Sequence, residues 1–451
     1  MQKRIYGIET EYGIIFTPEG RKTLPVEKAI RFLFEKLITT EHFLNVFLEN
    51  GARFYQDTGC HPEYATPECA SPRQLIVYDK AGERILEDLQ LYAEEKIREE
   101  RIAGKLSIFK NNTDFVGNSY GCHENYLVRR EADFAATIDA LLPFLVTRQI
   151  YSGAGKLLRT ARGVRFTISQ RAEHVWEGVS SATTRSRPIV NTRDEPHADA
   201  AMFRRLHVIA GDSNMSETVT YAKVGVVGAL LQMLEDGKRF RALDLENPIR
   251  AIREISADPT CKRRVRLANG RELSALDIQW EYLDEATRYG RLRGFPPSIE
   301  KAIRYWEQML VGIEQDPMRL ADQLDWVAKW QLIEAYRSRH DLSLSDPKLA
   351  MMDLAYHDID PDRGLYHLLV RTGRMHRAVA DEAVERSRVE PPATTRARLR
   401  GSFIKAAKAA GRDFTVDWVH LKLNDQAKRT ILCKDPFVHT DRRVERLIEG
   451  L

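Results

Sequence analysis

Charged and apolar residues alternate with a period of two in a segment close to the start of the chain. Glu9 and Glu11 fall at alternate positions, and Ile8 and Tyr12 flank them on either side. Successive side chains of a β-strand point to opposite faces. We therefore expect a strand here with one apolar face and one acidic face.

A second segment shows the same alternation. Arg53, Tyr55 and Asp57 would share one face of a strand, with Phe54 on the other, and Glu63 follows just beyond a turn. Carboxylates gathered on one sheet repel one another and lose hydration unless a cation joins them. A hard divalent cation that holds phosphates suits such oxygen ligands. The two segments together predict a cation and phosphate site on a sheet.

The remaining pattern predicts helices and strands without an internal repeat. Helical spacing of apolar residues covers 25–48, 81–101, 132–151, 216–234 and 297–340. Strand-like runs cover 106–110, 122–128, 163–170, 206–210 and 416–423. Because no regular β-α-β rhythm joins them, we expect an α+β fold in which an antiparallel sheet is backed by helices. Trp306, Trp326 and Trp330 are expected in its core.

A proline pair marks the expected boundary between two domains. Pro391 and Pro392 end a polar stretch, and a basic helix ending at Gly411 is predicted after them. We expect a large catalytic domain over residues 1–385 and a small domain over 386–451. The length of 451 residues, above the usual size of one domain, agrees with this division.

Composition and motifs exclude several classes of protein. The 69 Lys and Arg residues against 65 Asp and Glu give a net charge of +4, which argues against a nucleic-acid coat or a membrane-surface protein. Five cysteines without a C-x-x-C pair, and acid groups where a signal peptide would be apolar, favour the reducing cytoplasm. The sequence contains neither G-x-x-x-x-G-K-[ST] nor a G-x-G-x-x-G that opens a helix. A nucleotide would therefore bind on the sheet itself, through metal and arginine.

Two further polar clusters are candidates for the same site. Residues 110–126 hold four asparagines together with His123, although a glycine-containing hairpin explains this run equally well. Guanidinium groups match phosphate and carboxylate oxygens. The second cluster brings four arginines in among small and hydroxyl residues: Arg171, Arg185, Arg187 and Arg193.

Simpler explanations compete with these site predictions. Glu9 could pair with Arg53 in a structural ion pair, and Asp57 beside Gly59 could form a turn. The basic helix that starts near Arg396 could bind nucleic acid, but no aromatic residues are interleaved with its charges. The presence of two acid-bearing strands, instead of one, is what favours a site.

Longer motifs carry a resemblance to one family. They include G-I-E-T-E-Y-G, N-G-A-R-F-Y-Q-D-T-G-C-H-P-E-Y-A-T-P-E-C, G-N-S-Y-G-C-H-E-N-Y and D-F-T-V-D-W-V-H-L-K-L-N-D-Q-A. Through them nearly the whole chain resembles the family of Pup ligases and depupylases. This family stands with glutamine synthetase among the carboxylate-amine ligases. The resemblance implies their curved antiparallel sheet, which cradles metal-bound ATP.

The resemblance also implies partners and individual site residues. The partners are Pup, a small acidic disordered protein, and proteins that offer a lysine, with neither nucleic acid nor membrane among them. The cofactors are ATP and Mg²⁺. The implied residues are the magnesium ligands Glu9, Tyr55 and Glu63, the ATP contacts Arg53, Thr66 and Trp418, and the catalytic base Asp57.

Within this family the sequence favours a ligase over a depupylase. The resemblance associates depupylases with a T-E-V-E-Y-G opening and a long loop, whereas the segment from Gly13 to Arg53 holds one predicted helix and little else. The expected reaction joins the side-chain carboxylate of Pup's C-terminal glutamate to lysine ε-amines through a γ-glutamyl phosphate. The isopeptide bond formed would mark proteins for proteasomal degradation. The alternative is a depupylase that hydrolyses Pup–lysine bonds.

Overall fold

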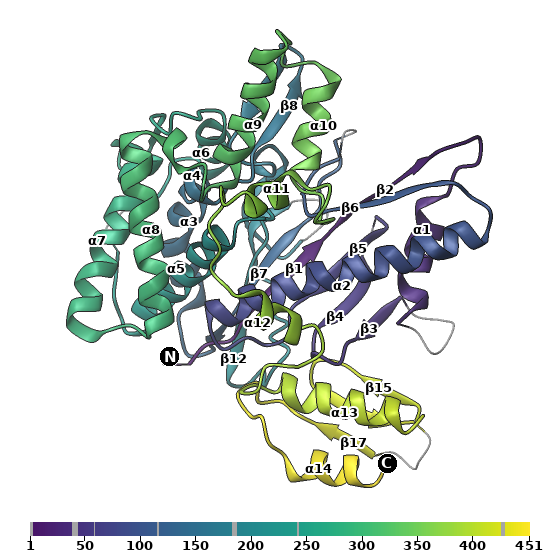
Figure 1. The fold of residues 1–451 in the computed structure, drawn as a ribbon. Helices are drawn as coiled ribbons and strands as arrows, with labels where there is room; N and C mark the ends of the chain where they lie inside the picture. Colours follow the sequence, from purple (N-terminus) through teal and green to yellow (C-terminus); the bar gives the residue numbers. More distant parts are fainter. Residues whose placement is uncertain are drawn as a thin grey trace.

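An eight-stranded sheet forms the centre of the molecule (Figure 1). The computed structural model describes residues 3–37, 44–57, 59–114, 117–182, 187–240, 243–424 and 429–451. In spatial order the strands of the sheet are β10 (Glu177–Ser180), β11 (Pro188–Asn191), β12 (Phe203–Val208), β7 (Cys122–Arg129), β1 (Tyr6–Glu11), β5 (His61–Ala65), β4 (Arg53–Asp57) and β3 (Asn45–Phe47). Neighbours pair antiparallel except β10 and β11, which are parallel.

Helices cover one face of this sheet and extend beside it (Figure 1). The first two are α1 (Val26–Glu35) and α2 (Pro72–Glu99). A largely helical part follows, with α3 (Phe134–Thr147), α4 (Gln149–Ser152), α5 (Glu217–Glu235), α6 (Pro248–Ser256), α7 (Ala275–Arg293), α8 (Pro297–Gln315), α9 (Asp325–Arg339), α10 (Pro347–Ala355), α11 (Leu365–Arg371) and α12 (Asp381–Arg386). Among the described helices, none combines the length and the apolar character that crossing a bilayer requires. The predicted α+β fold is confirmed.

The smaller sheets lie at the edges of this arrangement. They pair β2 (Gly13–Pro18) with β6 (Gly104–Phe109), β8 (Lys156–Thr160) with β9 (Gly163–Thr167), and β13 (Arg264–Arg266) with β14 (Glu272–Ser274). The C-terminal part of the chain, yellow in Figure 1, holds α13 (Ala397–Ala409), a sheet of β15 (Phe414–Val416), β16 (His420–Leu423) and β17 (Arg429–Leu432), and α14 (Arg442–Glu449). This C-terminal unit has an apolar cluster of its own. The division at residue 385 stays a prediction.

The apolar face of the central strands is buried against α2. Ile8, Phe54 and Tyr64 are each at most 2% exposed. They alternate along their strands with the acidic positions, as the sequence predicts. A Cβ atom on Gly82 of α2 would lie 2.5 Å from the ring of Tyr64. The missing side chain at residue 82 therefore allows the helix to approach the sheet closely.

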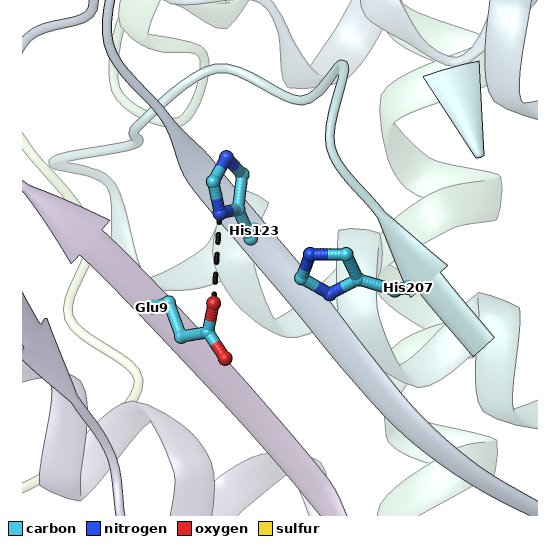
Figure 2. Close-up of side chains that lie close together, drawn as sticks. All are labelled: Glu9, His123 and His207. Atoms are coloured by element: carbon cyan, nitrogen blue, oxygen red, sulfur yellow. Dashed lines mark ion pairs between the residues drawn. The ribbon is translucent and has the colours of Figure 1, made fainter. Parts of the chain in front are cut away.

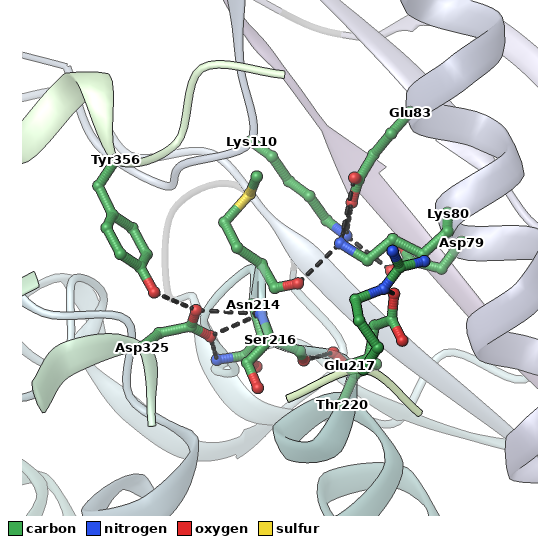
Figure 3. A network of polar contacts seen from close by, with 12 residues as sticks. Asp79, Lys80, Glu83, Lys110, Asn214, Ser216, Glu217, Thr220, Asp325 and Tyr356 are labelled. Carbon is green, nitrogen blue, oxygen red and sulfur yellow. Dashed lines mark hydrogen bonds and ion pairs between the residues drawn. The ribbon is translucent and has the colours of Figure 1, made fainter. Parts of the chain in front are cut away.

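A buried network of charges joins the segments behind the sheet (Figure 3). Lys110, directly after β6, donates hydrogen bonds to Asp79 at 2.6 Å and to Glu83 at 2.7 Å. Lys80 also donates to Glu83, and to the carbonyl oxygen of Met215 at 2.7 Å. All four charged groups are buried, and their two positive and two negative charges balance. The network ties α2 to the segment after β6 and to the residues that precede α5.

Most predicted elements are confirmed, although their ends differ. The predicted helix over 81–101 begins earlier, at Pro72, because the Ser71 side chain caps it by accepting a hydrogen bond from the backbone of Gln74. Trp306 and Trp326 are fully buried, and Trp330 packs partly buried against the same cluster.

The helix predicted over 25–48 is wrong in its second half. The helix ends at Glu35, residues 38–43 lie outside the described residues, and residues 45–47 form β3. In β3, Val46 pairs with Phe54 of β4. Residues 45–47 form a strand because they pair with a neighbouring strand. The periodicity of a single segment does not reveal such pairing.

The strand predicted over 416–423 is interrupted by a turn. Asp417 accepts hydrogen bonds from the backbone N–H groups of Val419 at 2.8 Å and His420 at 2.7 Å. Such bonds from an aspartate side chain to nearby backbone groups favour turns over strands. Trp418 therefore lies in a turn between β15 and β16.

Candidate functional site

Three neighbouring strands carry acid groups on the same face of the sheet. Glu11 of β1 pairs in register with Glu63 of β5, and Glu63 pairs with Tyr55 of β4. Asp57 follows Tyr55 by two positions and shares its face. Oxygen atoms of Glu11, Asp57 and Glu63 lie within 4.8 Å of one another. Strand pairing thus brings together the groups whose common face the alternation predicted.

Glu9 belongs to a second group, shown in Figure 2, with His123 of β7 and His207 of β12. Ligand atoms of the three residues lie within 4.8 Å of one another, and Nδ1 of His123 is 3.5 Å from Oε2 of Glu9. Nδ1 of His207 lies 2.8 Å from Oδ1 of Asn125, a contact that orients the ring. Imidazole nitrogens with a carboxylate suit borderline divalent ions, whereas a set of carboxylates alone suits hard ones.

Both groups line one open cleft with a volume of about 410 Å³. We call it the acidic cleft. Besides the two groups, it is lined by Tyr55 and by three of the four arginines singled out in the sequence, Arg171, Arg187 and Arg193. The fourth, Arg185, lies outside the described residues. Arg171 is buried and donates hydrogen bonds to the carbonyl oxygen of Tyr120 and to Ser119.

Glu63 is a carboxylate of the acidic cleft whose charged form is disfavoured by its surroundings. Burial raises its pKa well above the usual value, and the charges of Glu9 and Glu11 raise it further. Its side chain is 2% exposed, and no described lysine or arginine forms an ion pair with it. Burial and the charges of Glu9 and Glu63 likewise raise the pKa of Tyr55 well above its usual value. A cation placed here would relieve both burial and repulsion.

Glu9 has the opposite electrostatic environment. Burial by itself would raise its pKa, but the hydrogen bond with His123 and the charge of Arg205 hold the pKa of Glu9 below its usual value. Burial lowers the pKa of His207 well below its usual value, so its imidazole is neutral at pH 7. Neutral imidazole is the form that binds metal ions.

A second cavity adjoins the acidic cleft, and Glu9 lines both. Thr66 after β5 and Trp418 of the C-terminal unit line this second cavity, together with His197 from the loop between β11 and β12. We call it the Trp418 cavity. The Thr66 hydroxyl accepts a hydrogen bond from the backbone of Ile8 at 3.0 Å. Thr66 and Trp418, which are far apart in the sequence, thus share one cavity.

Arg53 of β4 pairs in register with Ala65, the residue before Thr66. Its Nε donates to Oδ1 of Asn45 at 2.8 Å, and its guanidinium lies 3.9 Å from the ring centre of Tyr55. Arg53 is not among the residues that line either cavity. The ion pair of Glu9 with Arg53, considered as an alternative from the sequence, is replaced by one with Arg205 at 3.5 Å.

Sequence reasoning missed two groups of β12 and gave no role to Glu11. Arg205 and His207 alternate along β12, and His207 pairs in register with Asn125. Their spacing of two, in a segment predicted as a strand only from residue 206, was the available signal. The interruption of the apolar pattern by a single histidine did not reveal which strand would lie next to it.

The fold and the site are those of an α+β protein whose sheet presents carboxylates and histidines to an open cleft beside a second cavity. The chain belongs to the Pup-ligase protein family, whose sequence model matches residues 4–422. A Pup–protein ligase of Nocardioides sp. (strain JS614) is 58% identical over 453 residues, covering 100% of both chains. The Pup–protein ligase of Saccharomonospora viridis is 57% identical over 452 residues, again covering 100% of both.

Two solved structures of a Pup ligase named PafA share the fold. In the complex of PafA with the prokaryotic ubiquitin-like protein Pup, the match covers 100% of this chain and 91% of the other, with a TM-score of 0.94 and 42% identity. PafA in complex with ADP matches with a TM-score of 0.86 and 42% identity, covering 97% and 96%. The family and the fold predicted from the sequence motifs are confirmed.

Replacing Glu63 with glutamine is expected to stabilise the metal-free protein. The raised pKa means that the folded state resists ionisation of Glu63, so the wild type loses stability as pH rises above about 4.3, the unfolded value. Glu63→Gln should therefore raise the free energy of unfolding by about 1–3 kcal/mol at pH 7 and by less at pH 5. Urea unfolding in EDTA at both pH values measures this. Glu272→Gln, at an exposed position, serves as the control, and an equal or lower stability of Glu63→Gln at pH 7 would contradict the prediction.

Proposed function

We propose that this chain is an ATP-dependent Pup ligase, which joins the side-chain carboxylate of Pup's C-terminal glutamate to the ε-amine of a substrate lysine. The observation that carries the proposal is the meeting of two cavities at Glu9, one lined by carboxylates and one by Trp418 and Thr66. Joining a carboxylate to an amine requires activation of the carboxylate and neutralisation of phosphate charge. The two adjoining cavities offer a place for each end of ATP.

In this proposal the nucleoside of ATP lies in the Trp418 cavity and its phosphates extend past Glu9 into the acidic cleft. The indole of Trp418 offers a stacking surface, and the C-terminal unit thereby completes the nucleotide site. PafA, at 42% identity, has been solved in complex with ADP. Arg53 would contact ATP after exchanging its bond to Asn45 for one to a phosphate.

The donor set of the acidic cleft fits Mg²⁺. Glu63 and Tyr55 supply hard oxygen ligands on neighbouring strands, and Glu9 supplies another where the two cavities meet. Glu11 adds a further carboxylate near Glu63. The group of Glu9, His123 and His207 would hold a second cation. When bound, these ions act as Lewis acids that neutralise phosphate charge.

Different residues of the chain would then assist each of two chemical steps. The γ-phosphoryl group of ATP passes to the glutamate carboxylate, giving ADP and an acyl phosphate, while Arg171, Arg187 and Arg193 balance charge on the oxygens. The lysine amine attacks the carbonyl carbon, loses a proton and expels phosphate. A lysine with a pKa of about 10.4 is mostly protonated at pH 7, so Asp57 would orient the amine and accept its proton.

Asp57→Asn is expected to keep ATP binding and to lose conjugation. Asparagine has nearly the same size but cannot accept the proton, and general base catalysis contributes about 10²–10⁴-fold to a rate. Calorimetry of ATP uptake and a gel assay for the Pup conjugate measure the two properties separately. Asp284→Asn, on the exposed side of α7, serves as the matched control. Conjugation by Asp57→Asn at the wild-type rate would remove Asp57 from this role.

The reaction itself is tested with ATP, Mg²⁺, Pup ending in glutamate and a lysine-bearing protein. A heavier covalent adduct that depends on ATP is expected. A preformed Pup conjugate, incubated without free Pup, tests the related activity of a depupylase. Release of Pup from that conjugate, without any adduct formation in the first assay, would replace the ligase with a hydrolase.

Two cation positions are expected, and they should be separable by substitution. Mn²⁺ is a paramagnetic stand-in for Mg²⁺ that also accepts histidine nitrogen. With an unreactive ATP analogue, the wild type should bind two Mn²⁺ ions by electron paramagnetic resonance titration, and Glu11→Gln and His207→Gln should each bind one. His340→Gln, at an exposed position on another part of the molecule, is the control. One ion in the wild type would contradict the two positions.

The proposed location is the cytoplasm. All five cysteines are free thiols: Cys60, Cys69, Cys122, Cys261 and Cys433. Four of them are buried, so they act as small apolar residues in the core and none needs an oxidising compartment.

A further inference from the structure

A buried cluster of three charged residues joins the C-terminal unit to the central sheet. Glu68, 7% exposed, lies two residues after Thr66. Its carboxylate accepts hydrogen bonds from Nε and NH2 of Arg396 at 2.9 and 2.6 Å. It also accepts from NH1 and NH2 of Arg400 at distances of 2.5–2.7 Å. We call Glu68, Arg396 and Arg400 the Glu68 cluster.

All N–H groups of Arg396 are engaged within the protein. Two go to Glu68, one goes to the carbonyl oxygen of His197 at 2.8 Å, and the remaining two go to the carbonyl oxygens of Cys433 at 2.9 Å and Lys434 at 3.2 Å. A guanidinium has five such donors. Arg396 therefore has no donor left for a ligand, although it lines the Trp418 cavity. Its role is to hold other groups in place.

One of the groups that Arg396 holds is a strained residue. His197 has a φ of +49°, in the left-handed region that side chains other than glycine rarely adopt. Its ring centre lies 5.9 Å from that of Trp418, and both side chains line the Trp418 cavity. The hydrogen bond from Arg396 to the His197 carbonyl fixes this loop against the C-terminal unit.

Arg400 supports Trp418 directly. Its guanidinium lies 4.9 Å from the centre of the Trp418 ring and 5.3 Å from that of Phe47. Phe47 of β3 packs edge to face against Trp418 at 5.1 Å. Trp418 stands in a turn, where backbone pairing does not fix a side chain. The planar guanidinium and the Phe47 ring therefore hold the indole in position.

We propose that Glu68, Arg396 and Arg400 are positioning residues for the reaction, which set the walls of the Trp418 cavity so that it accepts the nucleoside of ATP. Three of the segments that line that cavity, those of Thr66, His197 and Trp418, meet at this one cluster. The inference rests on the proposed function, in which this cavity binds ATP. It adds that the geometry of the cavity depends on an ion cluster whose members bond to one another and to the surrounding backbone.

A merely structural contact between two parts of the chain leads to a different expectation. Such a contact would alter stability and overall activity together. The acidic cleft is formed by β1, β4, β5, β7 and β12, and the Glu68 cluster contributes no residue to it. Disturbing the cluster should therefore raise the KM for ATP while leaving kcat at saturating ATP nearly unchanged.

Arg400→Lys tests this separation. Lysine keeps a positive charge for Glu68 but loses the planar group under Trp418. The expected result is an increase of about tenfold in the KM for ATP with kcat within about twofold of the wild type. Arg396→Lys, which loses the bonds to His197 and Cys433, should give the same split and replaces Arg400→Lys if that variant does not fold. Lys329→Arg, in the buried pair with Asp353 of the helical part, is the control and should not change KM.

A double-mutant cycle with Trp418→Ala decides whether Arg400 acts through Trp418. Trp418→Ala alone should raise the KM for ATP by about 10–100-fold. In that background Arg400→Lys should add less than about twofold. Full additivity of the two effects, or a loss of kcat at unchanged KM, would overturn the inference while the proposed function stands. A wild-type protein that takes up no ATP in calorimetry would instead overturn the proposed function, and this inference with it.

Discussion

Mutual repulsion among carboxylates on β1, β4 and β5 is the constraint around which the site is arranged. Strand pairing fixes Glu11 opposite Glu63, and the apolar face of the same strands is sealed against α2, so the acid groups cannot move apart or turn away. In the absence of a cation, burial and the charges of Glu9 and Glu11 raise the pKa of Glu63, so it takes up a proton more readily than a free glutamate does. Holding these carboxylates close together lowers the stability of the folded protein. The divalent cation and phosphates of the proposed function would restore that stability.

The pKa values of two of the acid groups that line the acidic cleft are shifted in opposite directions by their neighbours. The hydrogen bond with His123 and the charge of Arg205 lower the pKa of Glu9, whereas burial and the charges of neighbouring carboxylates raise the pKa of Glu63. A cation that binds beside Glu63 must therefore displace a proton, and one that binds beside Glu9 need not. Glu9 also lines the Trp418 cavity. In the proposed function its carboxylate, whose pKa is lowered, therefore lies beside the path of the ATP phosphates. Because a carboxylate and phosphates repel one another, this position of Glu9 favours a nucleotide that is bound together with a divalent cation.

The period-two alternation was enough to predict which acid groups share a face, because side-chain direction in a strand follows from the backbone alone. It predicted Arg53, Tyr55 and Asp57 on one face of a strand, with Glu63 just beyond the following turn, without knowledge of their neighbours. Whether β12 would lie beside β7 depends on pairing across some 80 residues, so His207 was not assigned. The same holds for β3, which the helical spacing of 25–48 concealed. The position of Trp418 beside Thr66 came from the family resemblance, since no local pattern links two residues that far apart.

The acidic cleft and the Glu68 cluster differ in the groups that neutralise their charges. This difference indicates that the first binds a ligand and that the second holds neighbouring segments in place. The acidic cleft itself opens to solvent, but Glu11 and Glu63 are buried in its wall, and neither forms an ion pair with a described lysine or arginine, so the cation of the proposed function would balance their charge. At the Glu68 cluster positive charge is in excess, but Glu68, Arg396 and Arg400 are all buried. Carbonyl oxygens of Gly51, His197, Cys433 and Lys434 take up N–H groups that Glu68 does not. Apart from the buried Nε of Arg400, the N–H groups of the two arginines are engaged within the protein, so the cluster can hold the walls of the neighbouring cavity whether or not that cavity is filled.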